Sequence, residues 1–296
     1  MTTETLCLLA VHAHPDDEAS KGAGTIARYH AEGVRTVLVT ATGGEEGEIL
    51  NPALDTDAVR KDLPEIRRRE LEEAANAIGY DELVLLGYRD SGMPESAANA
   101  DPRSFWQAPI DEATGRLVAA IRTYRPQVVV TYPDEQNFYP HPDHLRVHDI
   151  SLLALDRVGD AGAYPEAGAP YQPLKLYYTV WQLEQILLRH EKFLEFGLES
   201  PYAEWFKDGV PEDFPDRAPT TLIDVSSFYD ARRAGLMAHA TQIDPSSPFW
   251  FGLPEQVERE VFRTDGYVLA RNLVGPIEPE DDLFAGVRER VGAAAK

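Results

Sequence analysis

Short apolar runs alternate along the chain with longer segments in which apolar residues recur every three to four positions. The runs are too uniformly hydrophobic to leave one face in water, so we expect strands that are covered on both sides. The longer segments have the spacing of amphipathic helices, with capping residues and glycines at their ends. The expected strands are residues 5–11, 34–41, 83–87 and 127–132, and the expected helices are residues 20–32, 63–78 and 110–124.

Strands that alternate with helices of this length predict right-handed βαβ units and a parallel sheet. The expected fold class is therefore α/β, with a Rossmann-like, doubly wound and mostly parallel sheet in the strand order 3-2-1-4-5. The regularity fades after about residue 159, where residues 159–173 are rich in Gly, Pro and Ala and should form a surface loop. Further strands are expected at residues 175–181 and 220–225, with helices at residues 182–196 and from the end of the last strand to about residue 242.

The fading of this alternation predicts two parts in the chain. Residues 1–159 should form a Rossmann-like catalytic core. Residues 160–296 should form a C-terminal α+β extension, which completes the sheet and caps the active site rather than folding as an independent domain.

Composition and charge narrow the possible partners. The 296-residue chain is 43% hydrophobic, enough to fill a sizeable core, and its net charge of -22 would repel a nucleic-acid backbone. Its one cysteine, Cys7, excludes an internal disulfide and a cysteine-based zinc site, which fits a reducing compartment. Since there is no charged leader and no apolar stretch near the ~18 residues that a membrane span needs, we expect a cytoplasmic protein without membrane or nucleic-acid partners. A homo-oligomer remains open.

Two polar clusters follow strands that should be neighbours. Residues 12–18, His-Ala-His-Pro-Asp-Asp-Glu, follow the first strand, and residues 139–144, Tyr-Pro-His-Pro-Asp-His, follow the fourth. In the expected strand order both clusters begin at the carboxyl edge of the sheet, where ligands bind in such folds. A single His-Pro-Asp can be only a turn with an Asx cap, but capping requires neither the repetition nor this placement.

The residue types in these clusters predict a metal site. Imidazole and carboxylate groups without a thiolate suit Zn²⁺ or a similar divalent ion, and Fe²⁺ remains possible. Three protein ligands would leave coordination positions open for water and substrate. We expect these ligands to be His14, Asp17 and His144.

The other polar residues of the clusters suggest catalytic roles. Asp16 should lie beside the metal without binding it, as a general base for metal-assisted hydrolysis of an amide or ester. His141 could donate a hydrogen bond or a positive charge to the developing oxyanion. Asp143 should either orient a ligating histidine or cap the helix that follows. His12 and His148 are expected to be hydrogen-bonded structural histidines.

Two further segments are less specific. Residues 42–48, Thr-Gly-Gly-Glu-Glu-Gly-Glu, are too acidic to bind phosphate and should form a flexible loop over the site, suited to hydroxyls or amines. The run Arg67, Arg68 and Arg69 usually indicates a solvated helix face, although one arginine could turn inward.

The two clusters resemble the motifs of the zinc-dependent de-N-acetylase superfamily, typified by N-acetylglucosaminyl-phosphatidylinositol de-N-acetylases. Within it the chain is most similar to the mycothiol S-conjugate amidases, and the similar stretches run from residue 11 to residue 286. They include Glu-Ala-Ser-Lys-Gly-Ala at 18–23, Gly-Glu-Ile-Leu-Asn-Pro at 47–52, Asp-Ser-Gly-Met at 90–93, Lys-Leu-Tyr-Tyr at 175–178 and Ala-His-Ala-Thr-Gln-Ile-Asp-Pro at 238–245.

The resemblance implies an amidase for a small thiol-sugar conjugate. It would cut the cysteinyl-glucosamine amide bond of mycothiol S-conjugates, giving glucosaminyl-inositol and a mercapturic acid. It implies the same zinc ligands, base and electrophilic helper, and it adds Tyr139 as an aid to the tetrahedral intermediate. Lys21 matches a lysine typical of the amidases, and the residues that match positions near the sugar and inositol hydroxyls are Glu48, Arg67 and Asp90.

One departure from the subfamily pattern leaves the substrate open. Gln136, Asn137 and Phe138 precede Tyr139 where members have a Gly-Gly pair. The alternatives are a deacetylase of N-acetylglucosaminyl-inositol, a specialised paralogue that trims thiol adducts of a secondary metabolite, and a non-catalytic sugar-binding protein.

Overall fold

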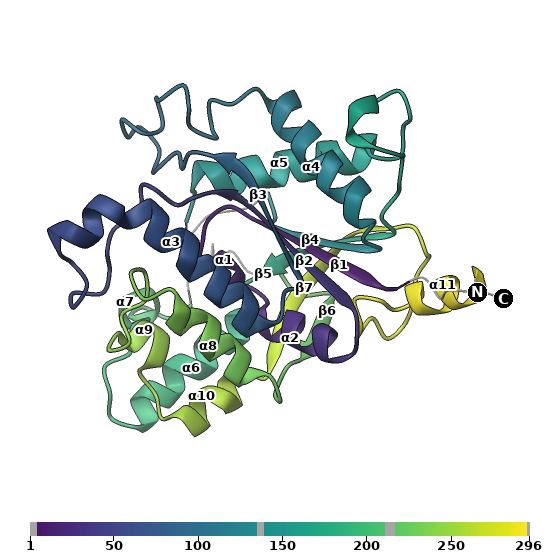
Figure 1. The fold of residues 1–296 in the computed structure, drawn as a ribbon. Coiled ribbons are helices and arrows are strands. Elements are labelled where there is room, and N and C mark those ends of the chain that lie inside the picture. The colour runs from purple at the N-terminus through teal and green to yellow at the C-terminus, as the bar shows by residue number, and fades with distance from the viewer. Residues whose placement is uncertain (1–4, 135–138, 211–216, 295–296) are drawn as a thin grey trace.

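Seven strands form one sheet in the computed structural model, which describes residues 5–134, 139–210 and 217–294 (Figure 1). The sheet order is β3-β2-β1-β4-β5-β7-β6. The first five strands of the chain pair in parallel, whereas β7 runs antiparallel to both of its neighbours. The strands are β1 (Cys7–His12), β2 (Arg35–Thr42), β3 (Glu82–Tyr88), β4 (Val128–Thr131), β5 (Lys175–Val180), β6 (Thr221–Asp224) and β7 (Thr264–Asn272).

Both faces of the sheet are covered, as the apolar strands predict. Every residue of β1 is buried, and alternate side chains enter opposite cores, Leu9 and Val11 on one face and Leu8 and Ala10 on the other. Helices α4 (Ile110–Tyr124) and α5 (Pro142–Arg157) cover the first face, and α2 (Ala23–Ala31), α3 (Asp57–Ile78) and α8 (Tyr229–Ala238) cover the second (Figure 1).

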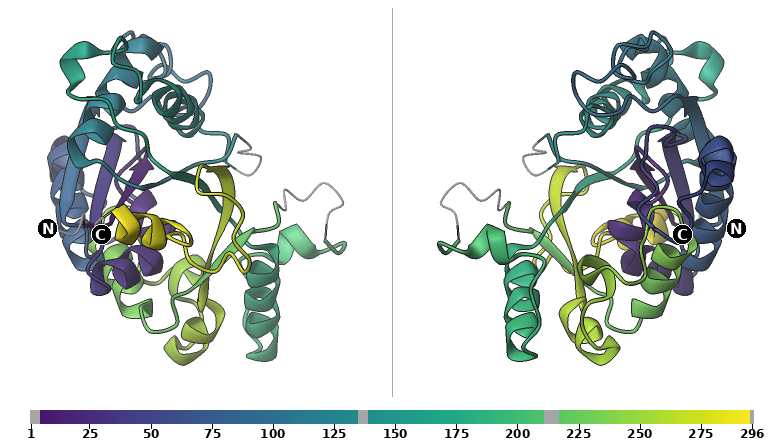
Figure 2. Two further views of the ribbon diagram at one scale, coloured as in Figure 1. Left: turned by 90° about the vertical axis from the view of Figure 1, so that its right-hand side faces the viewer. Right: turned by 90° about the vertical axis from the view of Figure 1, so that its left-hand side faces the viewer.

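Four helices at one side of the molecule form what we call the cap: α6 (Leu183–Glu195), α7 (Ala203–Phe206), α9 (Pro248–Phe251) and α10 (Glu255–Val261) (Figure 2). The remaining helices are α1 (Asp17–Ser20), the 3-10 turn η1 (Pro165–Ala167) and α11 (Val287–Ala294). In the part of the chain that the structure describes, none of the helices combines the length and the apolar character needed to cross a membrane.

The predicted α/β class and the order of the five parallel strands are confirmed. The helix expected at residues 20–32 is present as α2 but begins at Ala23, because Gly22 has a φ of 91° and separates it from α1, which ends at Ser20. A side chain at Gly22 would also place its Cβ 2.5 Å from the hydroxyl of Tyr267. Strand β7 was not expected, and α3 begins at Asp57, six residues earlier than predicted. Since one sheet takes strands from both sides of residue 159, the division there stays a prediction.

Candidate metal centre and active site

Three of the predicted residues meet at the carboxyl edge of the sheet. Because β1 and β4 pair in parallel, the turn after β1 and the start of α5 lie next to each other. His14 Nδ1 and His144 Nε2 each lie 3.4 Å from the same carboxylate oxygen of Asp17, and these side chains are at most 9% exposed. One ligand atom from each residue lies within 4.8 Å of the others. This buried set of two imidazoles and one carboxylate fits a divalent ion such as zinc.

Asp16 lies beside this set with its backbone in an unusual conformation. Its φ of 117° is in a region that non-glycine residues rarely adopt, and its N–H donates to Glu18 Oε2 at 3.0 Å. The side chain is about a third exposed to the cavity and accepts a hydrogen bond from Arg67 at 3.0 Å. Burial raises the pKa of the Asp16 carboxyl, and the Arg67 guanidinium opposes that shift. Asp16 is therefore held close to the candidate ligands.

Arg67 is the member of the arginine run that turns inward. Its buried guanidinium donates to the carbonyl oxygens of Pro15, at 2.6 Å, and Gly44, in addition to Asp16. The approach is so close that a Cβ on Gly47 would lie 2.2 Å from Nη1 of Arg67. Arg67 thus ties the β1 turn to the glycine-rich loop after β2, and its predicted contact with the substrate stays a prediction.

The other residues predicted near the substrate line one cavity with Asp16, but their contacts differ. Lys21 Nζ lies 2.5 Å from Asp17 Oδ1, so it pairs with a candidate ligand. Asp90 is buried and accepts a hydrogen bond from Gly92 N at 2.8 Å. Glu48 is exposed at the cavity wall. Their roles in substrate binding stay predictions.

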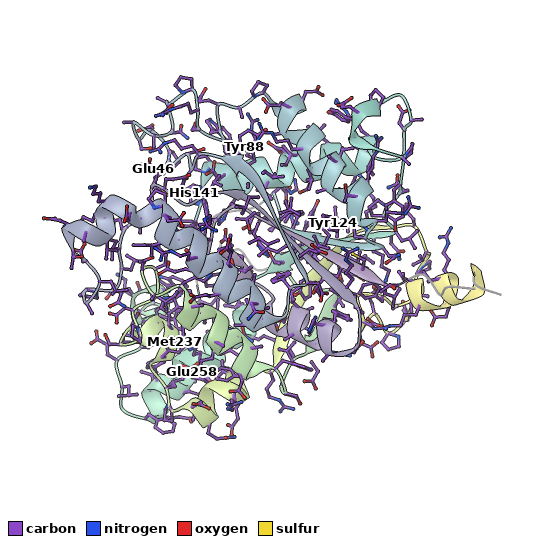
Figure 3. All side chains as sticks on the ribbon, viewed as in Figure 1. Glu46, Tyr88, Tyr124, His141, Met237 and Glu258 are labelled. Carbon is purple, nitrogen blue, oxygen red and sulfur yellow. The ribbon has the colours of Figure 1, made fainter. Side chains whose placement is uncertain are left out.

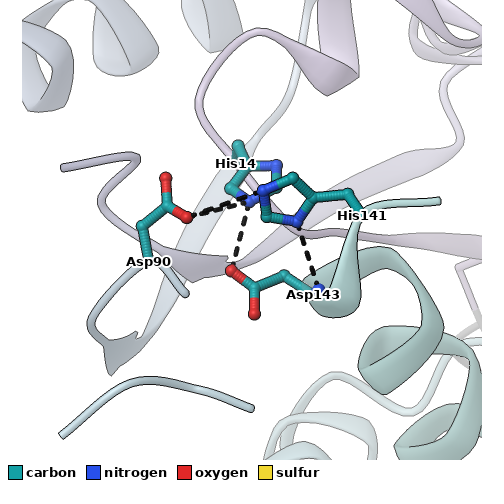
Figure 4. A group of neighbouring side chains, drawn as sticks. All are labelled: His14, Asp90, His141 and Asp143. Carbon is teal, nitrogen blue, oxygen red and sulfur yellow. Dashed lines mark hydrogen bonds and ion pairs between the residues drawn. The ribbon is translucent and has the colours of Figure 1, made fainter. Parts of the chain in front are cut away.

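Asp143 contacts the second nitrogen of His14 (Figure 4). Its Oδ2 lies 3.3 Å from His14 Nε2, while His14 Nδ1 faces Asp17. Ser91 donates both its N–H, at 3.0 Å, and its hydroxyl to the Asp143 carboxylate, which is fully buried. A carboxylate that binds the outer nitrogen of a ligating histidine fixes its ring and tautomer. The geometry favours the orienting role, since the α5 cap is His141.

His141 turns its outer ring nitrogen toward the same centre. Its Nδ1 accepts a hydrogen bond from Asp143 N at 3.2 Å, which leaves the proton on Nε2. That nitrogen is 3.8 Å from Asp90 Oδ1, too far for a hydrogen bond (Figure 4). Burial lowers the pKa of His141 to about 4, so the neutral hydrogen-bond donor is the favoured form. Figure 3 labels His141 at this centre and Glu258 in the cap, and the two residues lie well apart in that view.

Tyr139 lies at the mouth of the site. Its ring centroid is 5.6 Å from that of His141 and 5.5 Å from that of His144, and the residue is half exposed. The adjacent departure at Gln136, Asn137 and Phe138 lies outside the described residues.

Sequence reasoning missed Tyr132, which follows β4. Its hydroxyl accepts a hydrogen bond from Ala13 N at 3.0 Å and lies 3.3 Å from His12 Nδ1, and its ring stacks on His144 at 4.5 Å. Its carbonyl oxygen lies 2.9 Å from His148 Nδ1. Both histidines are therefore hydrogen-bonded, as expected. The position of Tyr132 at the end of a central strand was the signal that could have identified it.

A buried pair behind the site was also missed. His239 Nε2 lies 2.5 Å from Glu18 Oε1, and both side chains are fully buried. Because Glu18 also accepts the Asp16 N–H, this pair supports the turn that carries Asp16 and Asp17. Nothing local in the sequence indicates a contact across 221 positions.

The candidate ligands line one end of a cavity of about 880 Å³ that continues into the cap, together with Asp16, Tyr139 and His141. The end near His14 is polar. The other end, which we call the aromatic arm, is lined by the rings of Trp181, Tyr202, Trp205, Phe249, Trp250 and Phe262.

Known proteins match over nearly the whole chain. The profile of the PIG-L family, GlcNAc-PI de-N-acetylase, matches residues 9–155. A mycothiol S-conjugate amidase from Streptomyces coelicolor is 45% identical, over 97% of this chain and 99% of its own length. A 1D-myo-inositol 2-acetamido-2-deoxy-alpha-D-glucopyranoside deacetylase from Geodermatophilus obscurus is 40% identical, over 95% and 97%. The N,N'-diacetylchitobiose deacetylase from Pyrococcus horikoshii shares the fold, with a TM-score of 0.62 at 18% identity over 93% of this chain and 88% of that one.

Proposed function

This chain belongs to the PIG-L family of GlcNAc-PI de-N-acetylases, and on that premise we propose that it is a zinc amidase of mycothiol S-conjugates. Family membership makes it a metal-dependent deacetylase or amidase. The bond cut in our proposal joins the cysteinyl carbonyl to the glucosamine nitrogen, and the products are glucosaminyl-inositol and a mercapturic acid. The observation that carries the proposal is the convergence of His14, Asp17 and His144 beside the carboxylate of Asp16, which pairs with Arg67.

In this proposal the three ligands hold the ion and Asp16 handles the protons. When bound, zinc lowers the pKa of a water molecule and polarises a carbonyl group. Asp16 accepts a proton from the attacking water, as the bond from water oxygen to carbonyl carbon forms. The carbon–nitrogen bond then breaks, and the proton passes from Asp16 to the leaving amine. Arg67 keeps the Asp16 carboxylate in place throughout.

His141 and Tyr139 act on the carbonyl oxygen. The Nε2–H of His141 donates to this oxygen as it becomes negative, and a neutral imidazole is sufficient for that role. Tyr139, at the mouth, closes over the same atom. Asp143 and Ser91 keep the ring of His14 oriented.

Two features support the amidase over the deacetylase. The chain is 45% identical to the S. coelicolor amidase and 40% identical to the G. obscurus deacetylase, each over at least 95% of its length. Lys21 stands beside Asp17 at the position that resembles the amidases. The deacetylase remains the second candidate because the lower identity is still high across the full chain.

Parallel assays separate the two candidates. The purified, zinc-loaded protein is given a bimane conjugate of mycothiol and, separately, N-acetylglucosaminyl-inositol, and kcat/KM is measured for each. We expect the conjugate to be the better substrate by at least tenfold. A preference for the acetylated sugar would reject the amidase and retain the family chemistry, and Asp16→Asn serves as the inactive control for both.

A further inference from the structure

The cavity extends well beyond the candidate catalytic residues. Its lining also includes Lys21, Gly22, Val180 at the end of β5 and the rings of the aromatic arm. The polar residues predicted to face the sugar and inositol all lie at the His14 end, namely Glu48, Arg67 and Asp90. The aromatic arm is therefore a part of the cavity that the proposed chemistry does not use.

Five of the six rings of the aromatic arm form one continuous wall, although they come from separate segments of the chain. Phe249 lies 6.4 Å from Trp181, 6.0 Å from Tyr202 and 4.9 Å from Trp250, measured between ring centroids. Trp205 lies 5.4 Å from Tyr202. These distances are those of packed aromatic pairs, and such walls favour flat apolar ligands.

Arg189 fixes this wall and is itself among the residues that line the cavity. Its buried guanidinium donates to the carbonyl of Phe249 at 2.6 Å and to the hydroxyl of Tyr202 at 2.8 Å. It also pairs with Glu258 at 2.8 Å, so its charge is neutralised within the protein. A second guanidinium, of Arg232, lies 3.9 Å from the ring centroid of Phe262. Arg232 also lines the cavity, and its buried Nη1 has no hydrogen-bond partner among the described residues. The arm therefore combines an aromatic wall with one cationic group.

The two sides of an amide substrate diverge from the bond that is cut. If the sugar on the nitrogen side lies among the polar residues near Glu48, the acyl side points away from them, toward the cap. In a conjugate the acyl side carries the cysteine and its sulfur substituent, whereas an acetyl group ends after one methyl. An acetyl substrate would leave the arm empty.

We infer that the aromatic arm binds the S-substituent of the conjugate and selects flat aromatic groups over small ones. The inference rests on the proposed function. Trp181 is 47% exposed at the rim, which places a large ring where an entering substituent would cover it.

The test compares two conjugates in three proteins. S-benzyl and S-methyl mycothiol are assayed with the wild type, Trp181→Ala and, as a matched control, Phe196→Ala, which removes a half-exposed ring of α6's end that does not line the cavity. We expect kcat/KM in the wild type to favour the benzyl conjugate about tenfold, as aromatic packing and apolar burial allow. That ratio should fall about tenfold in Trp181→Ala and keep its wild-type value in Phe196→Ala. An unchanged ratio in Trp181→Ala would overturn the inference.

A binding measurement keeps this test separate from the test of the amidase. Calorimetry with the mercapturic acids N-acetyl-S-benzylcysteine and N-acetyl-S-methylcysteine reports on the arm without turnover. We expect the benzyl compound to bind about tenfold more tightly, and Trp181→Ala to remove the difference. Equal affinities would overturn the assignment of the arm. Tight benzyl binding by a protein that cleaves no conjugate would instead overturn the proposed substrate.

Discussion

Replacing His239 by glutamine would leave a buried carboxylate behind the active site without its charged partner. Glu18 and His239 are both fully buried and 2.5 Å apart. Burial disfavours both charges, but each group stabilises the other, so the pKa of Glu18 is lowered and that of His239 is raised. The pair is therefore ionised. When His239 is lost, Glu18 either remains a buried charge without its partner or takes up a proton, and both outcomes destabilise the fold.

The structure sets the size of the effect. Removing one partner of a buried ion pair destabilises a protein by about 3–5 kcal/mol. With an unfolding entropy of about 2.1 cal/mol/K per residue, the 296 residues give about 0.6 kcal/mol/K. The melting temperature of His239→Gln should therefore fall by about 5–8 °C. Activity should fall as well, because Glu18 accepts the N–H of Asp16.

Thermal unfolding of a double-mutant cycle measures the coupling. His239→Gln and Glu18→Gln are compared with the double variant, which holds two neutral amides and should be more stable than the sum of the single effects by about 1–3 kcal/mol. The control is His30→Gln, since His30 is half exposed beside Asp81 and should change stability by less than about 0.5 kcal/mol. The reasoning would be refuted if His239→Gln lowered the melting temperature by less than about 2 °C, or if the effects of the two single substitutions were additive.

Three further predictions concern the site and its support, and a fourth concerns Asp282, which does not line the cavity. Asp16→Asn should retain the metal, measured by elemental analysis, and lose about 10²-fold or more in kcat, and full activity would remove this residue from the mechanism. Ser91→Ala removes the hydroxyl donor to Asp143, so a chelator titration should show about tenfold weaker metal binding, and unchanged affinity would contradict that role. Lys21→Ala should reduce turnover of a mycothiol conjugate more than deacetylation of N-acetylglucosaminyl-inositol, whereas equal losses would end its use as a marker of the amidases. Burial opposes ionisation of Asp282, but its hydrogen bonds hold its pKa below the usual value, so its contribution to stability is present above about pH 4 and is lost as the pH falls through the folded-state pKa. Urea unfolding from pH 7 to pH 3 should show the gap between wild type and Asp282→Asn closing in acid, and a constant gap would contradict this assignment.

The sequence was sufficient for the features that depend on local pattern and on the rules of parallel sheets. The buried strand β1 and the four other parallel strands, β2 to β5, follow from the apolar runs and their alternation with helices. The meeting of residues 14 and 144 then follows from strand order alone, because the carboxyl ends of adjacent parallel strands share one edge.

The features that were missed depend on contacts between distant segments. Strand β7 contains Asp265, Gly266, Arg271 and Asn272, so its composition does not indicate a strand, and its pairing with β5 and β6 is what makes it one. The contact of His239 with Glu18 spans 221 positions and has no local signal. The aromatic arm likewise gathers rings from β5's end, α7 and α9, and only the folded chain brings them together.

The account depends on one divalent ion held by the two His-Pro-Asp turns, and anomalous diffraction from crystals of the zinc-loaded protein, recorded at the zinc edge, tests this most directly. We predict one peak at about 2.0–2.2 Å from His14 Nδ1, His144 Nε2 and an oxygen of Asp17, with Asp16 close by but not bound. A second group of buried donors also lies within 4.8 Å of one another, formed by the outer nitrogen of His14 with Asp90, His141 and Asp143. A zinc peak among those residues would contradict the account, as would the absence of any peak at this edge of the sheet.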